Sequence, residues 1–344
     1  MIAIDAFGGD RAPDEILAGA LLAHRQGVPV LLVGNADTLQ GKVPHGLSVV
    51  HAPEIVGMDE AAITPLRKKP QSSIRRIFEL VRDGQAAAAV TCGHSGAAMA
   101  SALHVLGAVP GVTRPPLATV VPRRDGGQLV LLDLGANVDC KADVLVQFAV
   151  LGDAYARAVL GVARPRVGLL ANGEEKGKGN EQVRQAWQLL EQIGQHEASL
   201  PGGVDAGLNF VGNIEPLSAL RGDCDVLVCD GFVGNVMLKT VEGTVEVVAR
   251  ILKEEILRRG SDRFAAWLLS GAWRRFRQRT TYDNVGGALL LGVNGIAVVG
   301  HGRADARAVA SALRFAHGCV QANLLSQVKA QVGERLVKRG RPLA

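Results

Sequence analysis

The residues best suited to chemistry in this chain lie in glycine-rich stretches that directly follow short apolar runs. The longest of these stretches, Asn172 to Glu181, reads NGEEKGKGNE and follows the run Val167–Leu170. It places two lysines among three glycines, and a flexible ammonium beside free backbone N–H groups suits a phosphate or a developing oxyanion. Lys178 and Asn180 are therefore candidates for binding an anion, although a solvated charged loop would have the same composition.

Amide and carboxylate side chains follow three further apolar runs in the middle of the chain. The run Val226–Cys229 leads into DGFVGN, Leu129–Leu134 leads into Gly-Ala-Asn, and Leu208–Val211 leads into Gly-Asn. Asn and Asp tolerate left-handed backbone geometry and can donate or accept at a ligand, so we expect these strand ends to contribute to a site. The candidates are Gly135, Asn137, Asn213, Asp230 and Asn235.

Three glycine-rich loops near the two ends of the chain provide a second group of candidates. The stretch Gly93–Gly96 is rich in glycine, carries a hydroxyl and opens a helix, which suits phosphate, but a tight turn explains it equally well. His301 stands between two glycines and could donate to a phosphate or an acyl oxygen, whereas a structural turn histidine is the alternative. The loop after Ile2–Ala6 is flanked by two carboxylates, which disfavour direct contact with a pyrophosphate. The candidates are Asp5, Gly8, Gly9, Asp10, Gly93, Ser95, Gly96 and His301.

The common signatures of nucleotide binding and covalent catalysis are missing from the sequence. There is no G-x-G-x-x-G after the first apolar run and no Walker loop. There is also no G-x-S-x-G elbow and no H-E-x-x-H. These absences disfavour covalent serine catalysis and zinc hydrolysis, but they permit acyl or phosphoryl transfer in which a bound substrate is itself the nucleophile.

The elements that must position these residues alternate between strand and helix. The apolar runs lack polar alternation, which is typical of parallel strands buried on both faces. Helical periodicity occupies the intervening segments Asp14–Gln26, Ser72–Asp83, Cys92–Gly107, Asp143–Leu160, Glu181–Ile193 and Ala304–Phe315, and Pro110–Pro122 is expected to cross between subdomains. We predict one large α/β domain over residues 1–330 with a mostly parallel sheet, and a basic tail over 331–344. In such sheets the loops after the strands form the ligand site.

Composition narrows the class of protein further. The 344 residues are 48% hydrophobic with a net charge of +5, which fits an anionic partner or substrate, although chance surface charge is an equal alternative. The five cysteines show no C-x-x-C pair, so reduced thiols in a cytosolic protein are expected. No signal peptide is visible, and no stretch reaches the ~18 uninterrupted apolar residues of a membrane span.

One segment departs from this pattern, within an amphipathic helical region expected at about 236–280. Trp and Phe side chains lie beside several arginines there, as in helices that rest on a membrane surface or at a subunit interface. An ordinary helix packed on a neighbour is the alternative. The residues concerned are Phe264, Trp267, Leu268, Trp273 and Phe276.

Taken in order, the motifs resemble those of the bacterial PlsX family of acyl-acyl carrier protein:phosphate acyltransferases. The resemblance covers nearly the whole chain and rests on IDAFGGDRAPDEIL, LRKKPQSSI, RPPLATVVP, LLDLGANVDCKADVLVQFAVLGDAYA, RPRVGLLANGEEKGKGNE, NFVGNIEP, CDVLVCDGFVGNVMLKTVEG, GGALLLGVNG and HGRADARA. It implies a Rossmann-like three-layer fold related to isocitrate and isopropylmalate dehydrogenases and to phosphate acetyltransferase.

The resemblance also implies an activity and a setting. An acyl group passes from the thioester of acyl carrier protein to inorganic phosphate, and the acyl phosphate serves a membrane glycerol 3-phosphate acyltransferase, PlsY, in phospholipid synthesis. The family implies a cytoplasmic homodimer that contacts the membrane peripherally and uses no metal, nucleotide or other cofactor and no nucleic acid. On this basis Lys178 is the essential cation, and Asn137, Asp230 and Asn235 are the other catalytic candidates.

The chain departs from the family pattern at several positions. His94 stands where the family has Asn in Gly-Asn-Thr-Gly, and Leu289 replaces Pro in Gly-Gly-Ala-Pro. Ala171 and Asn172 replace the first two residues of the family's Asn-Ile-Gly-Glu-Glu. These changes alter the side chains that the loops offer to a ligand, above all at position 94, where an imidazole replaces an amide. A metal- and NAD-dependent decarboxylating dehydrogenase of similar fold and a non-catalytic membrane-surface scaffold remain as alternative functions.

Overall fold

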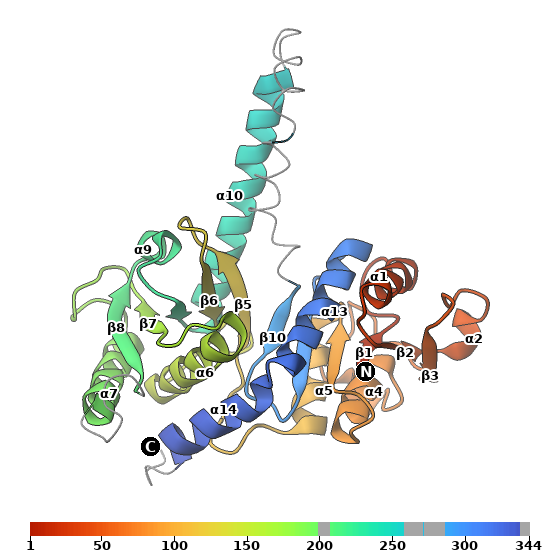
Figure 1. Cartoon of the computed structure of the whole chain (residues 1–344), viewed down its shortest axis with the longest axis horizontal. Coiled ribbons are helices and arrows are strands. Elements are labelled where there is room, and N and C mark those ends of the chain that lie inside the picture. The colour runs from red at the N-terminus through yellow and green to blue at the C-terminus, as the bar shows by residue number, and fades with distance from the viewer. Residues whose placement is uncertain (199–206, 258–270, 272–285, 338–344) are drawn as a thin grey trace.

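The computed structural model describes residues 1–198, 207–257, 271 and 286–337, and its strands form a single sheet (Figure 1). The strands are β1 (Ile2–Asp5), β2 (Val30–Gly34), β3 (Ser48–His51), β4 (Ala88–Thr91), β5 (Leu117–Pro122), β6 (Gln128–Leu132), β7 (Arg166–Leu170), β8 (Asn209–Ile214), β9 (Val226–Val228), β10 (Ala288–Leu290) and β11 (Ile296–Val299).

Helices connect most of these strands. They are α1 (Asp14–Arg25), α2 (Ala36–Leu39), α3 (Thr64–Arg67), α4 (Ser73–Arg82), α5 (Ser95–Leu106), α6 (Ala142–Leu160), α7 (Glu181–Ala198), α9 (Pro216–Arg221), α10 (Gly231–Leu257), α13 (Ala306–Gln321) and α14 (Leu324–Val332), which a π-helical turn (Gly333–Val337) extends.

The sheet has the order β3-β2-β1-β4-β11-β10-β5-β6-β9-β7-β8 and contains two parallel blocks. Strands β3, β2, β1, β4 and β11 form one block, and β6, β9, β7 and β8 form the other. Three successive antiparallel steps, from β11 through β10 and β5 to β6, join them. An odd number of reversals makes the two blocks run in opposite directions, so their carboxyl ends lie at opposite edges of the sheet.

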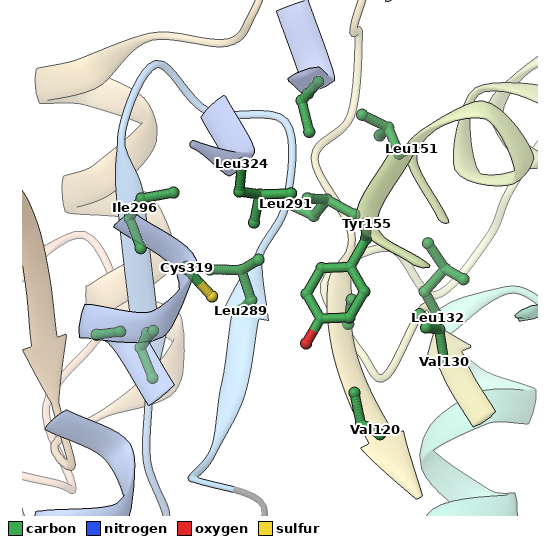
Figure 2. Close-up of a cluster of buried hydrophobic side chains, with 14 of the residues drawn as sticks. Val120, Val130, Leu132, Leu151, Tyr155, Leu289, Leu291, Ile296, Cys319 and Leu324 are labelled. Atoms are coloured by element: carbon green, nitrogen blue, oxygen red, sulfur yellow. The ribbon is translucent and has the colours of Figure 1, made fainter. Parts of the chain in front are cut away.

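Helices cover both faces of the sheet, because alternate strand residues point to opposite sides. Ile4 belongs to one buried cluster together with α1, α6, α7, α13 and α14, whereas Ala3 belongs to another with α4, α5, α9 and α10. Figure 2 shows the first cluster where the two blocks meet, with Tyr155 of α6 beside Val120 of β5 and Leu289 of β10. The predicted three-layer fold with a mostly parallel sheet is confirmed.

Several elements differ from the sequence expectation. The segment expected only to cross between subdomains contains β5, whose residues pair antiparallel with two neighbours. Strand β8 continues past Val211 through Asn213, because Gly212 at φ +95° accommodates a bulge opposite Val167 and Gly168. The stretch after Asp230, expected to be a loop, is the first turn of α10. Residues 331–337, expected in the tail, are helical, and Arg335 is buried.

Helix α10 projects away from the body of the molecule, as Figure 1 shows in turquoise. Much of its surface is exposed and apolar, including Val247, Val248 and Ile251. In the part of the chain that the structure describes, no helix combines the length and the apolar character that crossing a membrane requires. The aromatic and leucine residues between positions 264 and 276 lie outside the described residues.

Candidate functional site

The strand-end residues form two clusters rather than the single site that the sequence suggested. One gathers the carboxyl ends of β1, β4 and β11, and the other gathers those of β6, β9 and β7 with the end of β8. The opposite directions of the two blocks explain the separation. No hydrogen bond or ion pair within the described ranges joins the two clusters. Lys178 belongs to the second cluster, which we call the Lys178 cluster.

Asp133 organises the loop that follows β6 in the Lys178 cluster. Its Oδ1 accepts the backbone N–H groups of Leu117 at 2.8 Å and Leu134 at 2.7 Å, together with weaker contacts from the next two residues of the loop. Its Oδ2 accepts the Asn137 backbone N–H at 2.6 Å and side-chain Nδ2 at 3.0 Å. Burial raises the pKa of this carboxyl, while the hydrogen bonds it accepts lower it.

The same contacts determine what Asn137 can do. Its Nδ2 donates to Pro115 O at 3.1 Å as well as to Asp133, so both amide hydrogens are directed at protein acceptors. The structure therefore places the predicted oxyanion donor Asn137 in the cluster, but with its side-chain donors engaged.

The first turn of α10 packs directly on this loop. Gly231 N donates to Asn137 O at 2.8 Å, and a Cβ at Gly234 would stand 1.9 Å from Asp133 O, so a side chain has no room there. Asp230 Oδ1 accepts Val233 N at 2.8 Å and caps the helix. Asn235 is exposed one turn further on, close to Gly135, and its amide makes no hydrogen bond within the described part of the chain.

The two lysines of the loop between β7 and α7 differ in the contacts that their ammonium groups make. Lys176 Nζ pairs with Glu191 at 2.9 Å and lies 3.9 Å from the centre of the Trp187 ring. Lys178 is exposed, and its Nζ has no hydrogen bond or ion pair with the residues that the structure describes. A Cβ at Gly173 would stand 2.9 Å from Lys178 Cγ, so the glycine provides the space for the lysine stem. Within the part of the chain that the structure describes, Lys176 is thus engaged and the Lys178 ammonium is open to a ligand.

Further contacts join this loop to its neighbours. Gln182 Oε1 accepts Ala142 N at 2.9 Å, which places the start of α7 beside the start of α6. Asn180 Oδ1 accepts Val183 N at 2.9 Å and caps α7. Asn213 Nδ2 donates to Glu175 O at 2.8 Å. The N-termini of α6, α7 and α10 thus surround one sheet edge, and their partial positive charge favours an anion there.

In the first cluster, a chain of hydrogen bonds begins at the buried Asp5. Thr91 Oγ1 donates to Asp5 Oδ2 at 3.0 Å and accepts Gly93 N at 3.0 Å. A Cβ at Gly8 would stand 2.7 Å from both side-chain oxygens, so this loop passes close over them. Burial raises the pKa of Asp5, and this effect outweighs the hydrogen bonds from Ser73, Phe7 and Thr91, which lower it.

The remaining candidates of the first cluster surround this chain of bonds. Asp10 N donates to Gly302 O at 2.8 Å, which joins the loops after β1 and β11. His94 Nδ1 accepts Ala97 N at 3.1 Å and caps α5, and Ser95 is exposed at its first position. His301 Nδ1 accepts Arg303 N at 3.1 Å. Gly9 lies in the loop after β1 and Gly96 is the second residue of α5. Binding roles for all these residues stay predictions.

Sequence reasoning missed two residues on which these clusters depend, Asp133 and Thr91. Each is buried at the end of an apolar run, so the sequence pattern indicated a strand residue and not a site residue. A lone carboxylate inside the run Leu129–Leu134 was the available signal, because a buried charge requires partners. Thr91 gave no comparable signal, since threonine is ordinary in strands.

Comparison with known proteins identifies the chain's family. A family model described as "Fatty acid synthesis protein" matches residues 1–327. The phosphate acyltransferase of Trichlorobacter lovleyi is 43% identical over 340 residues, which cover 97% of this chain and 94% of that protein. The phosphate acyltransferase of Desulforudis audaxviator is 45% identical over 336 residues, covering 97% and 96%. The chain belongs to the phosphate acyltransferase family.

Solved structures of phosphotransacetylases share the fold of this chain. The enzyme from Streptococcus pyogenes superposes with a TM-score of 0.60 at 16% identity and covers 94% of each chain. A branched-chain phosphotransacylase from Enterococcus faecalis gives 0.55 at 16% identity, covering 92% of this chain and 99% of its own. The expected relation to the phosphate acetyltransferase fold is therefore confirmed.

Proposed function

We propose that this enzyme transfers a fatty acyl group from acyl carrier protein to inorganic phosphate at the Lys178 cluster. The observation that carries the proposal is the exposed Lys178 ammonium, which has no partner among the described residues and lies beside three helix N-termini, in a chain of the phosphate acyltransferase family. Such a setting attracts a doubly charged phosphate and has no need of a protein nucleophile. The alternative dehydrogenase function finds no support in the comparisons.

The reaction proceeds by direct displacement. A phosphate oxygen attacks the thioester carbonyl carbon and forms the new C–O bond, after which the C–S bond breaks and the carrier thiolate leaves and takes up a proton. Lys178 holds the phosphate. Asn235, whose amide makes no hydrogen bond with the described residues, donates to the developing oxyanion. Asn137, with Asp133, shapes the loop, and Asp230 fixes the helix turn that carries Asn235.

Replacing Lys178 tests this mechanism. We expect Lys178→Ala to lower kcat/KM for phosphate roughly 10²–10³-fold, the loss typical when a preorganised charge-stabilising group is removed. Lys176→Ala, two residues away and already paired with Glu191, should stay within a few-fold of the parent. The readout is phosphate-dependent release of free carrier thiol with formation of acyl phosphate. Near-normal turnover in Lys178→Ala would contradict the proposal.

We also propose that the enzyme is a homodimer and that it docks an acidic carrier protein. The exposed apolar residues of α10 support a homodimer formed through this helix, and the net charge of +5 supports docking of an acidic carrier protein. We expect Val247→Asp with Ile251→Asp to halve the mass measured by light scattering.

The association of the enzyme with the carrier protein should weaken as ionic strength rises, and an unchanged association rate would argue against electrostatic docking.

Peripheral membrane contact and coupling to the membrane glycerol 3-phosphate acyltransferase complete the proposed setting. The motivation is the aromatic and arginine-rich sequence between positions 264 and 276. Trp267→Glu with Trp273→Glu should abolish flotation of the enzyme with liposomes of anionic phospholipid. Unchanged flotation would remove the membrane role from this segment.

A further inference from the structure

A buried asparagine fastens the loop that carries Lys178 to the sheet. Asn213 lies near the end of β8 and is 3% exposed, and its Nδ2 donates to Glu175 O at 2.8 Å. Strand β8 pairs with β7, the strand from which this loop departs, with Asn213 opposite Leu169. The asparagine thus reaches from the adjacent strand into the middle of the loop.

The carbonyl oxygen of Glu175, which accepts the hydrogen bond from Asn213, also accepts one from the backbone of Lys178. Glu175 O accepts the Lys178 backbone N–H at 3.0 Å, so the Asn213 amide and the Lys178 amide meet at one oxygen. This shared acceptor links a rigid strand to the Lys178 backbone through two hydrogen bonds. Because a lysine side chain is long and flexible, the position of its backbone limits where its ammonium can reach.

The other hydrogen bonds and the ion pair that hold this loop are exposed to solvent. Ser218 Oγ donates to Glu174 Oε1 at 2.7 Å, Lys176 pairs with Glu191, and Asn172 Oδ1 accepts Gly179 N at 2.9 Å, all at exposed sites. Exposed polar contacts of this kind hold weakly because water competes for them. The Asn213 bond is part-buried, because its donor side chain is enclosed, and it is therefore better placed than the exposed contacts to decide the loop geometry.

Asn213 holds this position at a cost in stability. Its Oδ1 is buried, and no donor among the described residues lies within hydrogen-bonding distance. A buried acceptor without a partner is destabilising, and an apolar side chain would avoid the penalty. The hydrogen bond from Nδ2 to Glu175 O is the interaction that this placement of the amide provides.

We propose that Asn213 is a positioning residue for Lys178, acting through Glu175 O to set where the lysine ammonium meets phosphate. The proposal rests on the function assigned above to Lys178. Asn213 itself need not touch the substrate, which differs from the direct contact that its place after Gly212 in the sequence suggested.

Steady-state kinetics of Asn213→Ala test the proposal. We expect KM for phosphate to rise about tenfold, the factor that corresponds to one hydrogen bond of ordinary strength, with KM for the acyl carrier unchanged. Asn209→Ala is the matched control, because Asn209 lies half-buried on the same strand and its side chain makes no hydrogen bond within the described part. A loss of kcat with both KM values unchanged would mean fewer folded molecules and would overturn the proposal.

A double-mutant cycle separates this proposal from the role of Lys178. If Asn213 acts through Lys178, Asn213→Ala should cost almost nothing further when it is added to Lys178→Ala. A full additional tenfold loss would overturn the positioning role while leaving that of Lys178 intact. Near-normal activity of Lys178→Ala alone would instead overturn the proposed function.

A second variant serves if Asn213→Ala does not fold. Asn213→Asp has nearly the same shape, but its carboxylate cannot donate to Glu175 O, whereas the protonated carboxyl can. We expect the KM for phosphate, relative to that of the parent enzyme, to be raised at alkaline pH and to recover as the pH is lowered. A ratio that is independent of pH would overturn the proposal.

Discussion

His94 is a residue of the first cluster that departs from the asparagine of the Gly-Asn-Thr-Gly pattern expected from the family resemblance. The structure gives its imidazole a capping role, because Nδ1 accepts Ala97 N at 3.1 Å at the start of α5. An asparagine side chain can make the same bond. The substitution therefore preserves the helix start, and no phosphate contact is needed to explain the residue.

Two replacements of His94 distinguish capping from substrate binding. We expect His94→Asn to keep the stability and activity of the parent, and His94→Ala to lower the free energy of unfolding by about 1 kcal/mol, the usual value of an N-cap. Urea unfolding and acyl phosphate assays provide the two measurements. A large rise in KM for phosphate in His94→Asn, with unchanged stability, would show that the imidazole itself binds substrate.

At the scale of elements, the contact between α10 and the loop after β6 governs the shape of the Lys178 cluster. A Cβ at Gly234 would stand 1.9 Å from Asp133 O and 2.8 Å from Cys229 Sγ. Neither the backbone carbonyl nor the buried strand end can move away cheaply. The start of α10 therefore requires glycine at this position.

Alanine substitutions within α10 test this requirement. We expect Gly234→Ala to separate the helix from the loop, lower the free energy of unfolding by at least ~2 kcal/mol and reduce activity. Gly243→Ala on the same helix faces open space and should be neutral or stabilising by up to about 1 kcal/mol, because alanine favours helix. Thermal unfolding of both proteins measures the difference, and equal melting temperatures would rule out close packing at Gly234.

Most elements could be predicted from the sequence because their signals are local. The helix expected at Asp14–Gln26 is α1, which presents an apolar face with helical periodicity. That expected at Asp143–Leu160 is α6, a long apolar helix buried on all sides over most of its length. Strand β5 was missed because prolines flank it and its antiparallel neighbour β10 comes from the far end of the chain. The turn after Asp230 was taken for a loop because its two glycines, which the close packing requires, resemble loop residues.

The candidate site was less predictable than the fold. Most candidates of the Lys178 cluster could be grouped from the sequence because they follow apolar runs, and parallel neighbours bring such ends together. Asp133 could not, because it lies within its run. The separation of the first cluster could not be found in the same way. It depends on the number of antiparallel steps between the two blocks, which is a property of strand order and leaves no mark on any single run.

At the scale of the whole molecule, the C-terminal segment is fastened to the middle of the chain by a buried ion pair. Arg335 NH1 lies 2.6 Å from Asp153 Oδ2, and both side chains are at most 3% exposed. Asp153 also pairs with Arg157 at 3.0 Å on its own helix. Residues separated by more than half of the chain are thus joined across α6 and the turn that follows α14, which extends the packed core past residue 330.

Removing Arg335 should destabilise the whole enzyme without changing its site. We expect Arg335→Ala to lower the free energy of unfolding by about 3 kcal/mol, because the Asp153 carboxylate loses one of its two cationic partners inside the core. Arg314→Ala is the control, since Arg314 bonds Gln26 at an exposed position and should change stability by less than about 0.5 kcal/mol. Asp153→Asn added to Arg335→Ala should recover part of the loss by removing the buried charge. If KM for phosphate changed in Arg335→Ala, the two distant segments would be coupled to the Lys178 cluster, which their separate packing does not predict.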